Sequence, residues 1–274
     1  MEMARDAEGV TGSRDLIQLR GVSKTFEVRG SSTPALLPVS LDVRRHEFVG
    51  IVGPSGCGKS TILNILSGLM QPTSGVALYD GSPVTGPNMN VGYMTQKDTL
   101  LPWRTVADNV MLSLELRCRN VPDKEARERA ADMIGTVGLR GFEKHYPNEL
   151  SGGMRKRAAL ARTLIYEPET LLMDEPFGAL DAQLKLVMLH ELQRLAEIHK
   201  TTVLFVTHDL GEASTLSDRV VVIGGRPGRI KVVKEVPFPK PRNVYEIRFS
   251  TEFAKLNEEL WALLRDDVIG EGAT

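Results

Sequence analysis

Apolar residues divide the chain into short runs separated by polar and glycine-rich segments. Residues 16–20 and 37–43 alternate apolar with polar side chains, whereas residues 48–52 form one continuous apolar run. Alternation and β-branched residues predict strands in these segments. A fourth strand is expected at residues 76–79, after the chain breakers of residues 71–75. The N-terminal part of the chain is therefore predicted to be rich in β-structure.

The later part of the chain alternates apolar runs with helical patterns. Residues 170–173, 203–206 and 220–223 are mostly apolar, and a helical stretch at 182–199 separates the first two. Buried strands that alternate with helices are typical of a parallel sheet covered on both faces. Residues 109–165 are predicted to be mostly helical. The fold class indicated is α/β.

The two ends of the chain differ from this pattern. Residues 1–14 are expected to be a flexible N-terminus. Prolines at positions 237, 239 and 241 indicate a stiff connector. The apolar residues beyond it recur at helical spacing, so we expect a last helix that packs on the domain or on a partner. These apolar residues are Phe253, Leu256, Leu260, Leu263 and Leu264.

A glycine-rich stretch, residues 53–60, lies between the apolar run 48–52 and the helical pattern 61–69. Glycines let several backbone N–H groups point at one anion, and the helix N-terminus adds its partial positive charge. Lys59 would reach the terminal phosphates of a nucleotide, and the Ser60 hydroxyl would hold a magnesium ion. The stretch predicts nucleotide binding, the alternative being a glycine-rich turn that binds nothing. It consists of Gly53, Pro54, Ser55, Gly56, Cys57, Gly58, Lys59 and Ser60.

A second anion-binding pattern follows much later in the chain. Ser151, Gly152 and Gly153 precede an alanine-rich helical segment, so a hydroxyl, glycine backbones and a helix N-terminus come together. One nucleotide cannot readily use both this pattern and residues 53–60 of the same chain. The two patterns together predict a head-to-tail dimer that holds nucleotide between its subunits.

Two carboxylates, Asp174 and Glu175, end the apolar run that begins at Thr170. The carboxyl edge of a parallel sheet, beside a phosphate loop, is where a magnesium ligand and a base for water are expected. An acidic pair at a helix N-terminus is the alternative, and the neighbouring motifs disfavour it.

Composition restricts the class of partner and the compartment. The chain has 34 basic and 35 acidic residues, which gives no electrostatic reason to expect nucleic acid. Only Cys57 and Cys118 are present, which is typical of a reducing compartment. No apolar run approaches the about 20 residues that cross a bilayer, and residues 1–14 lack the apolar core of a signal peptide. We expect the protein to be kept in the cytosol.

These motifs, in this order, resemble the nucleotide-binding subunit of an ATP-binding cassette (ABC) transporter over residues 15–236. The resemblance implies a P-loop NTPase fold with a RecA-like parallel-sheet core and an antiparallel β subdomain. An α-helical subdomain would be inserted at about residues 97–165. Residues 237–274 would form a C-terminal linker and helix.

The resemblance also implies roles for individual residues. Phe26 would stack on adenine, Gln96 would sense the γ-phosphate, and Asp181 would lie at the dimer interface. The residues that act in hydrolysis would be Lys59, Gln96, Glu175 and His208, and the magnesium ligands Ser60, Gln96 and Asp174. The ATP ligands would be Phe26, Gly53, Pro54, Ser55, Gly56, Cys57, Gly58, Lys59, Ser60, Thr61, Gln96, Ser151, Gly152, Gly153, Asp181 and His208.

Residues 100–106 and 226–230 are similar to those of importers of the nitrate, sulfonate, taurine and thiamine-precursor type. The implied partners are a second, identical ATP-binding subunit, integral membrane permease subunits and, indirectly, a solute-binding protein. The chain would then work at the cytoplasmic face of the inner membrane. Leu100, Leu101 and Trp103 would suit contact with a helix of the membrane partner, the alternative being that they are core residues.

Two other functions remain as alternatives. A soluble ABC-type ATPase not coupled to transport usually has a second cassette, coiled coils or a basic extension, which this chain does not show. A module that only binds ATP has no need of Glu175, His208 and Asp181.

Lys156 departs from the commonest family pattern, as do Met154, His46 and Gly211. None of these departures removes an implied phosphate, magnesium or water contact.

Overall fold

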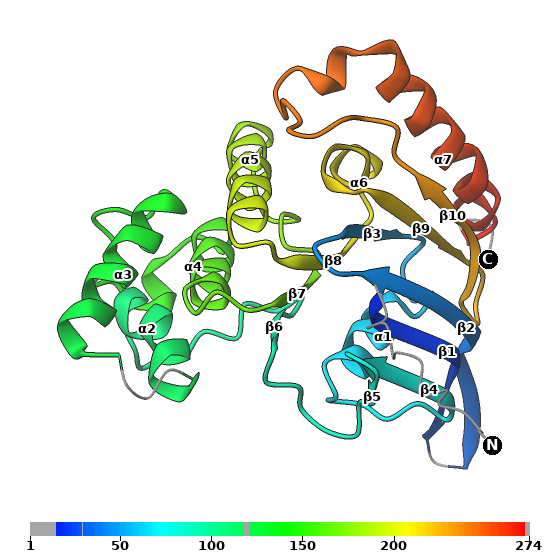
Figure 1. Ribbon diagram of the computed structural model, residues 1–274, viewed down its shortest axis with the longest axis horizontal. Helices are drawn as coiled ribbons and strands as arrows, with labels where there is room; N and C mark the ends of the chain where they lie inside the picture. The colour runs from blue at the N-terminus through cyan, green and yellow to red at the C-terminus, as the bar shows by residue number, and fades with distance from the viewer. Residues whose placement is uncertain (1–14, 29, 118–120, 272–274) are drawn as a thin grey trace, which may run out of the picture.

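A six-stranded sheet forms the centre of the protein (Figure 1). The computed structural model describes residues 15–28, 30–117 and 121–271. The strands run parallel except β10 (Arg229–Glu235), which is antiparallel to its neighbour. All residues of β3 (Phe48–Val52), β8 (Thr202–Thr207) and β7 (Thr170–Asp174) are buried. This confirms the predicted α/β class. In spatial order the strands are β10 (Arg229–Glu235), β9 (Arg219–Gly224), β3 (Phe48–Val52), β8 (Thr202–Thr207), β7 (Thr170–Asp174) and β6 (Val91–Met94).

A second, antiparallel sheet lies below the first in Figure 1 and has the strand order β2-β1-β4-β5. Residue Leu19 pairs with Leu41 on one side and with Ala77 on the other. The first two strands are much longer than the predicted 16–20 and 37–43, because they pair with each other through their polar ends as well. The strands are β1 (Asp15–Val28), β2 (Ser31–Arg44), β4 (Ser74–Tyr79) and β5 (Ser82–Pro83).

Helix α1 (Lys59–Leu66) lies between the two sheets. Its apolar residues Ile62 and Leu63 belong to one buried cluster with Leu19 of β1 and Ile51 of β3. The helix ends close to the predicted end at Gly68, which has a φ of 77° that favours glycine. The strand before the phosphate loop and the helix after it are therefore both fixed by core packing.

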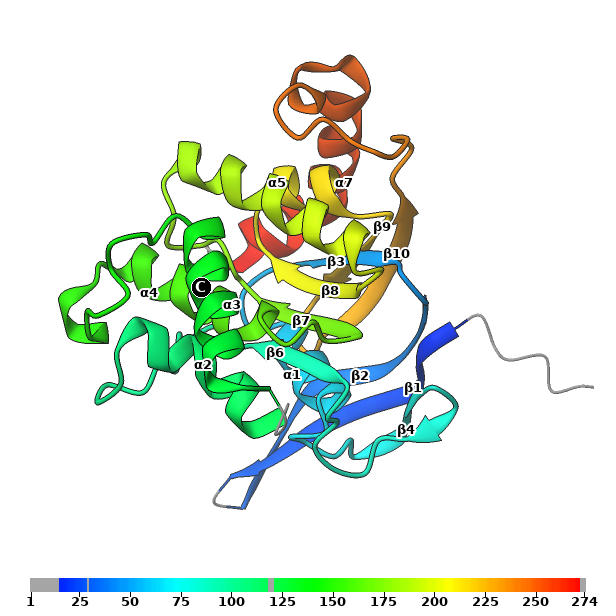
Figure 2. The ribbon, with the colours of Figure 1, turned by 60° about the vertical axis from the view of Figure 1, so that its left-hand side comes forward.

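The other helices pack in one further core (Figure 2). Three helices lie within the region predicted to be mostly helical, but residues 137–151 are irregular except for the 3-10 turn η1 (Pro147–Glu149). Strands β6 and β10 and helix α6 were not among the predicted elements, since a few residues show too little periodicity. The helices are α2 (Val106–Arg117), α3 (Asp123–Thr136), α4 (Gly152–Leu164), α5 (Ala182–Ile198), α6 (Leu210–Leu216) and α7 (Thr251–Glu271).

The C-terminal segment packs on the domain, as one of the two predicted arrangements requires. A 3-10 turn η2 (Ile247–Phe249) precedes α7, and Leu256, Leu260 and Leu264 of α7 are buried against α6 and β9. The boundaries at 14/15, 97/165 and 236/237 stay predictions, and residues 1–14 and Cys118 lie outside the described residues. Within the described part of the chain, no helix has the length and apolar character to span a membrane.

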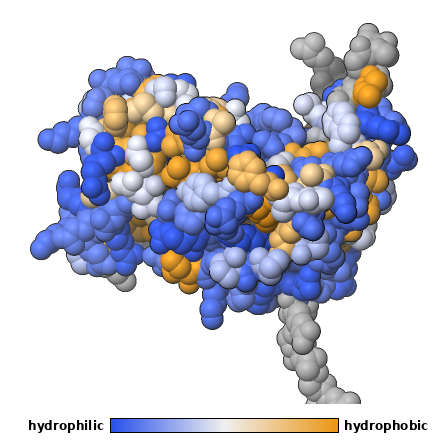
Figure 3. Space-filling model, turned by 90° about the horizontal axis from the view of Figure 1, so that it is seen from above, coloured by the Kyte–Doolittle hydropathy of each residue, from blue (hydrophilic) through white to orange (hydrophobic). Residues whose placement is uncertain are grey.

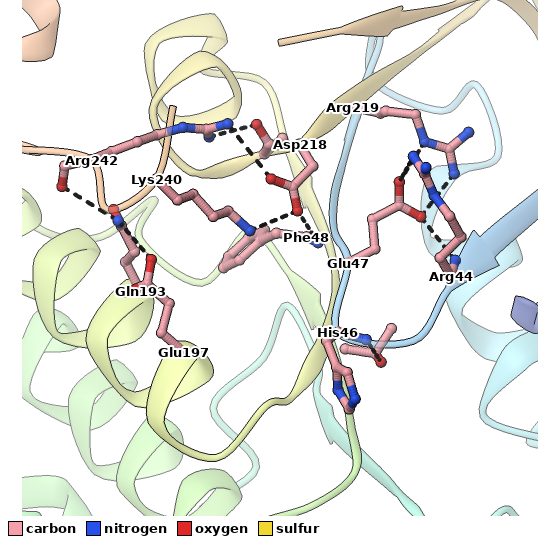
Figure 4. Close-up of polar contacts among 12 residues, drawn as sticks. Arg44, His46, Glu47, Phe48, Gln193, Glu197, Asp218, Arg219, Lys240 and Arg242 are labelled. Atoms are coloured by element: carbon pink, nitrogen blue, oxygen red, sulfur yellow. Dashed lines mark hydrogen bonds and ion pairs between the residues drawn. The ribbon is translucent and has the colours of Figure 1, made fainter. Parts of the chain in front are cut away.

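A buried carboxylate and the charged groups around it join β2, β3 and β9 (Figure 4). Glu47 is 5% exposed and accepts hydrogen bonds from Arg219 Nε at 2.6 Å and from the Arg44 backbone at 2.9 Å. Burial opposes ionisation of Glu47, but the hydrogen bonds from Arg219 and Arg44 outweigh it and lower the pKa of the carboxyl. Beside it, Asp218 accepts the Phe48 N–H at 2.9 Å and pairs with Lys240, so the C-terminal connector is tied to the start of β3.

We predict that Arg219→Met lowers the free energy of unfolding by about 2–3 kcal/mol, because Glu47 stays buried with one partner fewer. Since the folded-state pKa of Glu47 is depressed, its contribution is present above its ordinary pKa and is lost as the pH falls through the folded-state pKa. The variant raises that folded-state pKa, so acid unfolding should begin at a higher pH. Urea unfolding at several pH values measures both effects. Arg129→Met removes an exposed pair with Glu125 and should cost under about 1 kcal/mol; an equal loss in both variants would contradict the prediction.

Candidate functional site

The phosphate loop joins the buried end of β3 to the first turn of α1. Gly56 and Gly58 take φ values of 75° and 90°, which side chains with a Cβ rarely adopt. Gly58 is also the residue before α1, so the loop passes directly into a helix N-terminus. The strand, turn and helix predicted around residues 53–60 are thus all present.

Lys59 folds back over its own loop. Its Nζ donates to the carbonyl oxygens of Gly53 at 2.8 Å and Pro54 at 2.7 Å, and the residue is 7% exposed. The ammonium is therefore held at the loop by two backbone acceptors.

The two predicted carboxylates lie at the end of β7, next to the loop. Asp174 is buried, which raises the pKa of its carboxyl; a hydrogen bond from Ser60 opposes this shift and the charge of Glu175 adds to it. Glu175 has a φ of 49°, an uncommon conformation for a residue with a side chain, and its N–H donates to Val206 O at 2.9 Å. The strand end therefore presents one buried and one partly exposed carboxylate.

Both oxygens of Glu175 have a predicted site residue beside them. Gln96 Nε2 donates to Glu175 Oε2 at 3.3 Å, and His208 Nδ1 lies 3.4 Å from Glu175 Oε1. Gln96 follows β6 and His208 follows β8, so the carboxyl ends of neighbouring parallel strands bring these residues together.

A cavity of about 370 Å³ lies in front of this group. A larger hollow of about 520 Å³ lies along β4 and β5, but the ionisable groups among its lining residues are Tyr79, whose hydroxyl bonds Thr170, and Asp80, which pairs with Arg45. We therefore regard the smaller cavity as the functional one. Its lining residues are Phe26, Ala35, Ser55, Gly56, Gly58, Lys59, Ser60, Thr61, Gln96, Asp174 and Glu175.

The second anion-binding pattern does not line this cavity. Ser151 caps α4, its Oγ accepting the Met154 N–H at 3.3 Å, and Gly153 lies against the backbone of Ala179. Asp181 caps α5 by accepting N–H groups of that helix. Ser151, Gly152, Gly153 and Asp181 are thus separate from the phosphate-loop cavity of their own chain.

Residues that the sequence reasoning missed hold Gln96 and His208 in place. Lys156 of α4 donates to the backbone carbonyl of Gln96; burial lowers the pKa of Lys156, and the charges of Asp98, Asp174 and Glu175 oppose that shift. Lys156 was noted only as a departure from the family pattern, and no sequence spacing links it to a residue so far away.

A partly buried ion-pair network supports the segment that carries His208. Lys185 Nζ lies 2.7 Å from Glu212 Oε1 and 3.1 Å from Asp209 Oδ2, and Asp209 caps α6. Glu212 is 4% exposed and also accepts the Thr207 hydroxyl at 2.5 Å. Lys185 lies one helical turn after Asp181 in the sequence. This spacing could indicate the role of Lys185 only if α5 were already known to face α6.

The donors and acceptors around the cavity suit a nucleotide and a divalent cation. Backbone N–H groups of a loop and helix N-terminus bind phosphates, and hydroxyl and carboxylate oxygens such as those of Ser60 and Asp174 are ligands that Mg²⁺ prefers. Among the described residues, no group of three or more His, Cys, Asp or Glu side chains is placed to hold a metal, so Ser60 and Asp174 would share a cation with the phosphates.

Comparison with known proteins agrees with this geometry. Residues 36–178 match the ABC transporter family. An uncharacterised ABC transporter ATP-binding protein of Methanocaldococcus jannaschii is 45% identical over 269 residues, which are 97% of this chain and 98% of that protein. An aliphatic sulfonates import ATP-binding protein of Bacillus cereus is 40% identical over 227 residues, 83% of this chain and 88% of that protein. A nitrate import ATP-binding protein of Synechococcus elongatus is 41% identical over 241 residues, 87% of this chain and 37% of that protein.

Solved structures show the same fold. A dimeric ATP-binding cassette in a post-hydrolysis state, bound to ADP and Pi, matches with a TM-score of 0.76 and 32% identity over 81% of this chain and 100% of that chain. The chain belongs to the ABC transporter family. As an ABC ATPase it binds and hydrolyses ATP, and its two sheets and helices form the cassette fold that the resemblance implied.

We predict that Lys59→Ala lowers the affinity for ATP by at least about tenfold, because a charge-assisted contact to phosphate and a contact that holds the loop are both lost. Isothermal titration calorimetry with ATP measures the effect. Lys124→Ala, at a side chain 90% exposed on α3, is the matched control. Unaltered ATP affinity in Lys59→Ala would count against the assignment of the phosphate loop.

Proposed function

We propose that this chain is the ATP-hydrolysing motor subunit of an ABC importer that takes up a small solute of the nitrate or sulfonate type. The observation that carries the proposal is the cavity that joins the phosphate loop to Gln96, Asp174 and Glu175. Relatives named as sulfonate and nitrate import subunits support the choice of an importer. They disfavour the alternative of a soluble ABC-type ATPase not coupled to transport.

The active form in this proposal is a head-to-tail dimer of two identical chains. Ser151, Gly152 and Gly153 do not line the cavity of their own chain, so they are available to close over ATP held by the partner chain. Asp181 would lie at the interface between the chains. The solved dimers of related cassettes support this arrangement.

Glu175 is the residue proposed to polarise the attacking water and to accept its proton. Gln96 and His208 hold its two carboxylate oxygens in orientation. Its positive φ and the hydrogen bond from its N–H to Val206 of β8 limit the movement of its backbone. His208 and Gln96 would contact the γ-phosphate, and Lys59 would offset its charge. The adenine ring would stack on Phe26, which lines the same cavity.

Magnesium would be held by Ser60, Asp174 and Gln96. Burial raises the pKa of the Asp174 carboxyl although the charges of Lys59 and Lys156 oppose the shift, and a bound cation would further favour the ionised form. The cation would neutralise charge on the phosphate oxygens.

Hydrolysis would convert dimer closure into movement. Both chains grip the γ-phosphate in the closed dimer, so its loss removes contacts from each side of the interface and favours opening. Membrane subunits attached to the two chains would follow this opening and closing.

We predict that Glu175→Gln retains ATP binding but loses at least about 100-fold in kcat, because an amide cannot accept a proton from water. The variant should accumulate as a dimer on size-exclusion chromatography with ATP and magnesium. Phosphate release assays measure the turnover, and Glu128→Gln, at an exposed side chain on α3, is the control. A normal hydrolysis rate in Glu175→Gln would rule out the role given to Glu175.

The proposed contact with the membrane subunits lies on the side of α2. Trp103 is 72% exposed, and hydrogen bonds from Val106 N to His145 O at 2.8 Å and from Ala107 N to Glu143 O at 2.9 Å place its segment beside residues 142–146. That neighbouring segment adds the exposed rings of Phe142 and Tyr146. Figure 3 shows that apolar residues also gather in patches on a mostly hydrophilic face of the molecule. A short helix of a permease subunit would pack on these rings.

Leu100 and Leu101 differ from Trp103. Leu100 is 8% exposed and belongs to the core, and Leu101 is only partly exposed. For Leu100, therefore, the expectation of an exposed contact residue is wrong and the core alternative is confirmed.

We predict that a tagged Glu175→Gln chain, purified from gently solubilised membranes of its native cells with ATP and magnesium, brings a multi-span membrane protein with it. Adding Trp103→Ala should lower the recovery of that protein several-fold, because an exposed aromatic anchor is lost. Lys124→Ala in the same background is the control, and thermal unfolding checks that both variants fold. Recovery from the cytosol with nucleic acid or ribosomes would favour the soluble ATPase instead.

A further inference from the structure

The turn between β9 and β10, residues 224–228, lies directly behind the phosphate loop. A Cβ added to Gly228 would lie 1.8 Å from the carbonyl oxygen of Cys57, and one added to Gly53 would lie 2.3 Å from that of Ile223. The backbone of the β9–β10 hairpin therefore approaches the loop closely at two places, at Gly53 and at Cys57. Such close approach requires glycine at these positions.

Arg226, at the tip of this turn, bonds the middle of the loop. Its Nε donates to the Ser55 carbonyl oxygen at 3.0 Å, and its Nη2 donates to the same oxygen. The guanidinium also lies over Gly56, where an added Cβ would be 3.2 Å from Nε. Ser55 and Gly56 line the nucleotide cavity, whereas Arg226 does not, so Arg226 holds the loop from its outer side.

The direction of this contact has a consequence for the inner side of the loop. The Ser55 carbonyl and the Gly56 N–H belong to one peptide unit, and in a trans peptide they point in opposite directions. Holding the carbonyl outward on Arg226 therefore keeps the Gly56 N–H pointing inward. The charge of the guanidinium also polarises the peptide and makes that N–H a stronger donor.

We propose that Arg226 is a positioning residue for the phosphate loop, which pre-orders the Ser55–Gly56 peptide for the phosphates of nucleoside di- and triphosphates. The inference rests on the proposed role of residues 53–61 as phosphate ligands. It gives a physical role to Arg226, one of the residues 226–230 that are similar to those of the importer type. Arg226 itself does not contact the reacting atoms.

The test is the affinity of Arg226→Ala for ATP and for ADP, measured by calorimetry with magnesium. Both dissociation constants should rise about three- to tenfold, because the loop must be ordered at the moment of binding. The kcat at saturating ATP should stay within about twofold, since Glu175 and its partners are untouched. Arg226→Lys should restore part of the affinity, because an ammonium can donate to the carbonyl but lacks the planar fork.

Controls separate a positioning role from general support of the fold. Arg229→Ala removes an exposed arginine from the same hairpin and should leave both dissociation constants unchanged. Arg226 is exposed, so its alanine variant should keep the thermal unfolding temperature of the nucleotide-free protein. Gly228→Ala, which forces the turn away from Cys57, should raise both dissociation constants at least as much as Arg226→Ala.

The outcomes distinguish this inference from the proposed function. Dissociation constants within twofold of wild type in Arg226→Ala, while Lys59→Ala loses binding, would overturn the role of Arg226 alone. A lower unfolding temperature with unchanged affinity would also overturn it and leave a structural contact. If wild type bound no ATP, or Lys59→Ala bound it normally, the phosphate-loop assignment itself would be wrong.

Discussion

The candidate site depends on one constraint, which is the fixed backbone conformation of residues 53–58 in the loop between β3 and α1. The backbone carbonyls of this loop need hydrogen-bond partners of their own. Lys59 satisfies the carbonyls of Gly53 and Pro54, and Arg226 satisfies that of Ser55. The loop is thus supported by two cationic side chains, one at the start of α1 and one on the turn between β9 and β10, in addition to the buried strand and helix at its ends.

The same sheet edge carries a second, unfavourable feature. Asp174 is buried, with a pKa raised by burial, and Glu175 next to it holds a backbone conformation that costs about 1–3 kcal/mol. Buried packing of β7 between β6 and β8 maintains this arrangement in the protein alone. A bound cation would relieve the repulsion between the two carboxylates and would also offset the negative charge of bound phosphates, which is the physical reason to expect tight coupling between nucleotide and magnesium.

Much of the fold could be predicted because many of its elements are marked by short, continuous sequence patterns. The buried runs that became β3, β7, β8 and β9, and the loop before Lys59, are patterns a few residues long. Elements whose pattern was too short, such as α6 and β6, were not predicted. The lengths of β1 and β2 were also missed, because pairing between strands extends them through polar residues that alone predict no strand.

The contacts that position the site were less accessible than the site residues themselves. The bonds from Arg226 to Ser55, from Lys156 to Gln96 and from Lys185 to Glu212 join elements far apart in the chain or helices whose facing was unknown. Each uses a long flexible cation whose sequence neighbours do not indicate its partner. Motifs report what touches a ligand, whereas these side chains hold backbone and carboxylate groups behind it.

Helix α4 connects the two kinds of site. It begins at Ser151, which under the proposed dimer faces the partner's nucleotide, and Lys156 in its second turn bonds the backbone of Gln96 in the chain's own cavity. Arg155 and Arg162 of the same helix bond Asp98 and Thr99, so the whole segment after Gln96 is attached to α4. A rigid helix cannot move its first turn toward one nucleotide without moving the loop that it holds at the other. The two sites of such a dimer are therefore mechanically linked through each chain, and closure at one is expected to favour closure at the other.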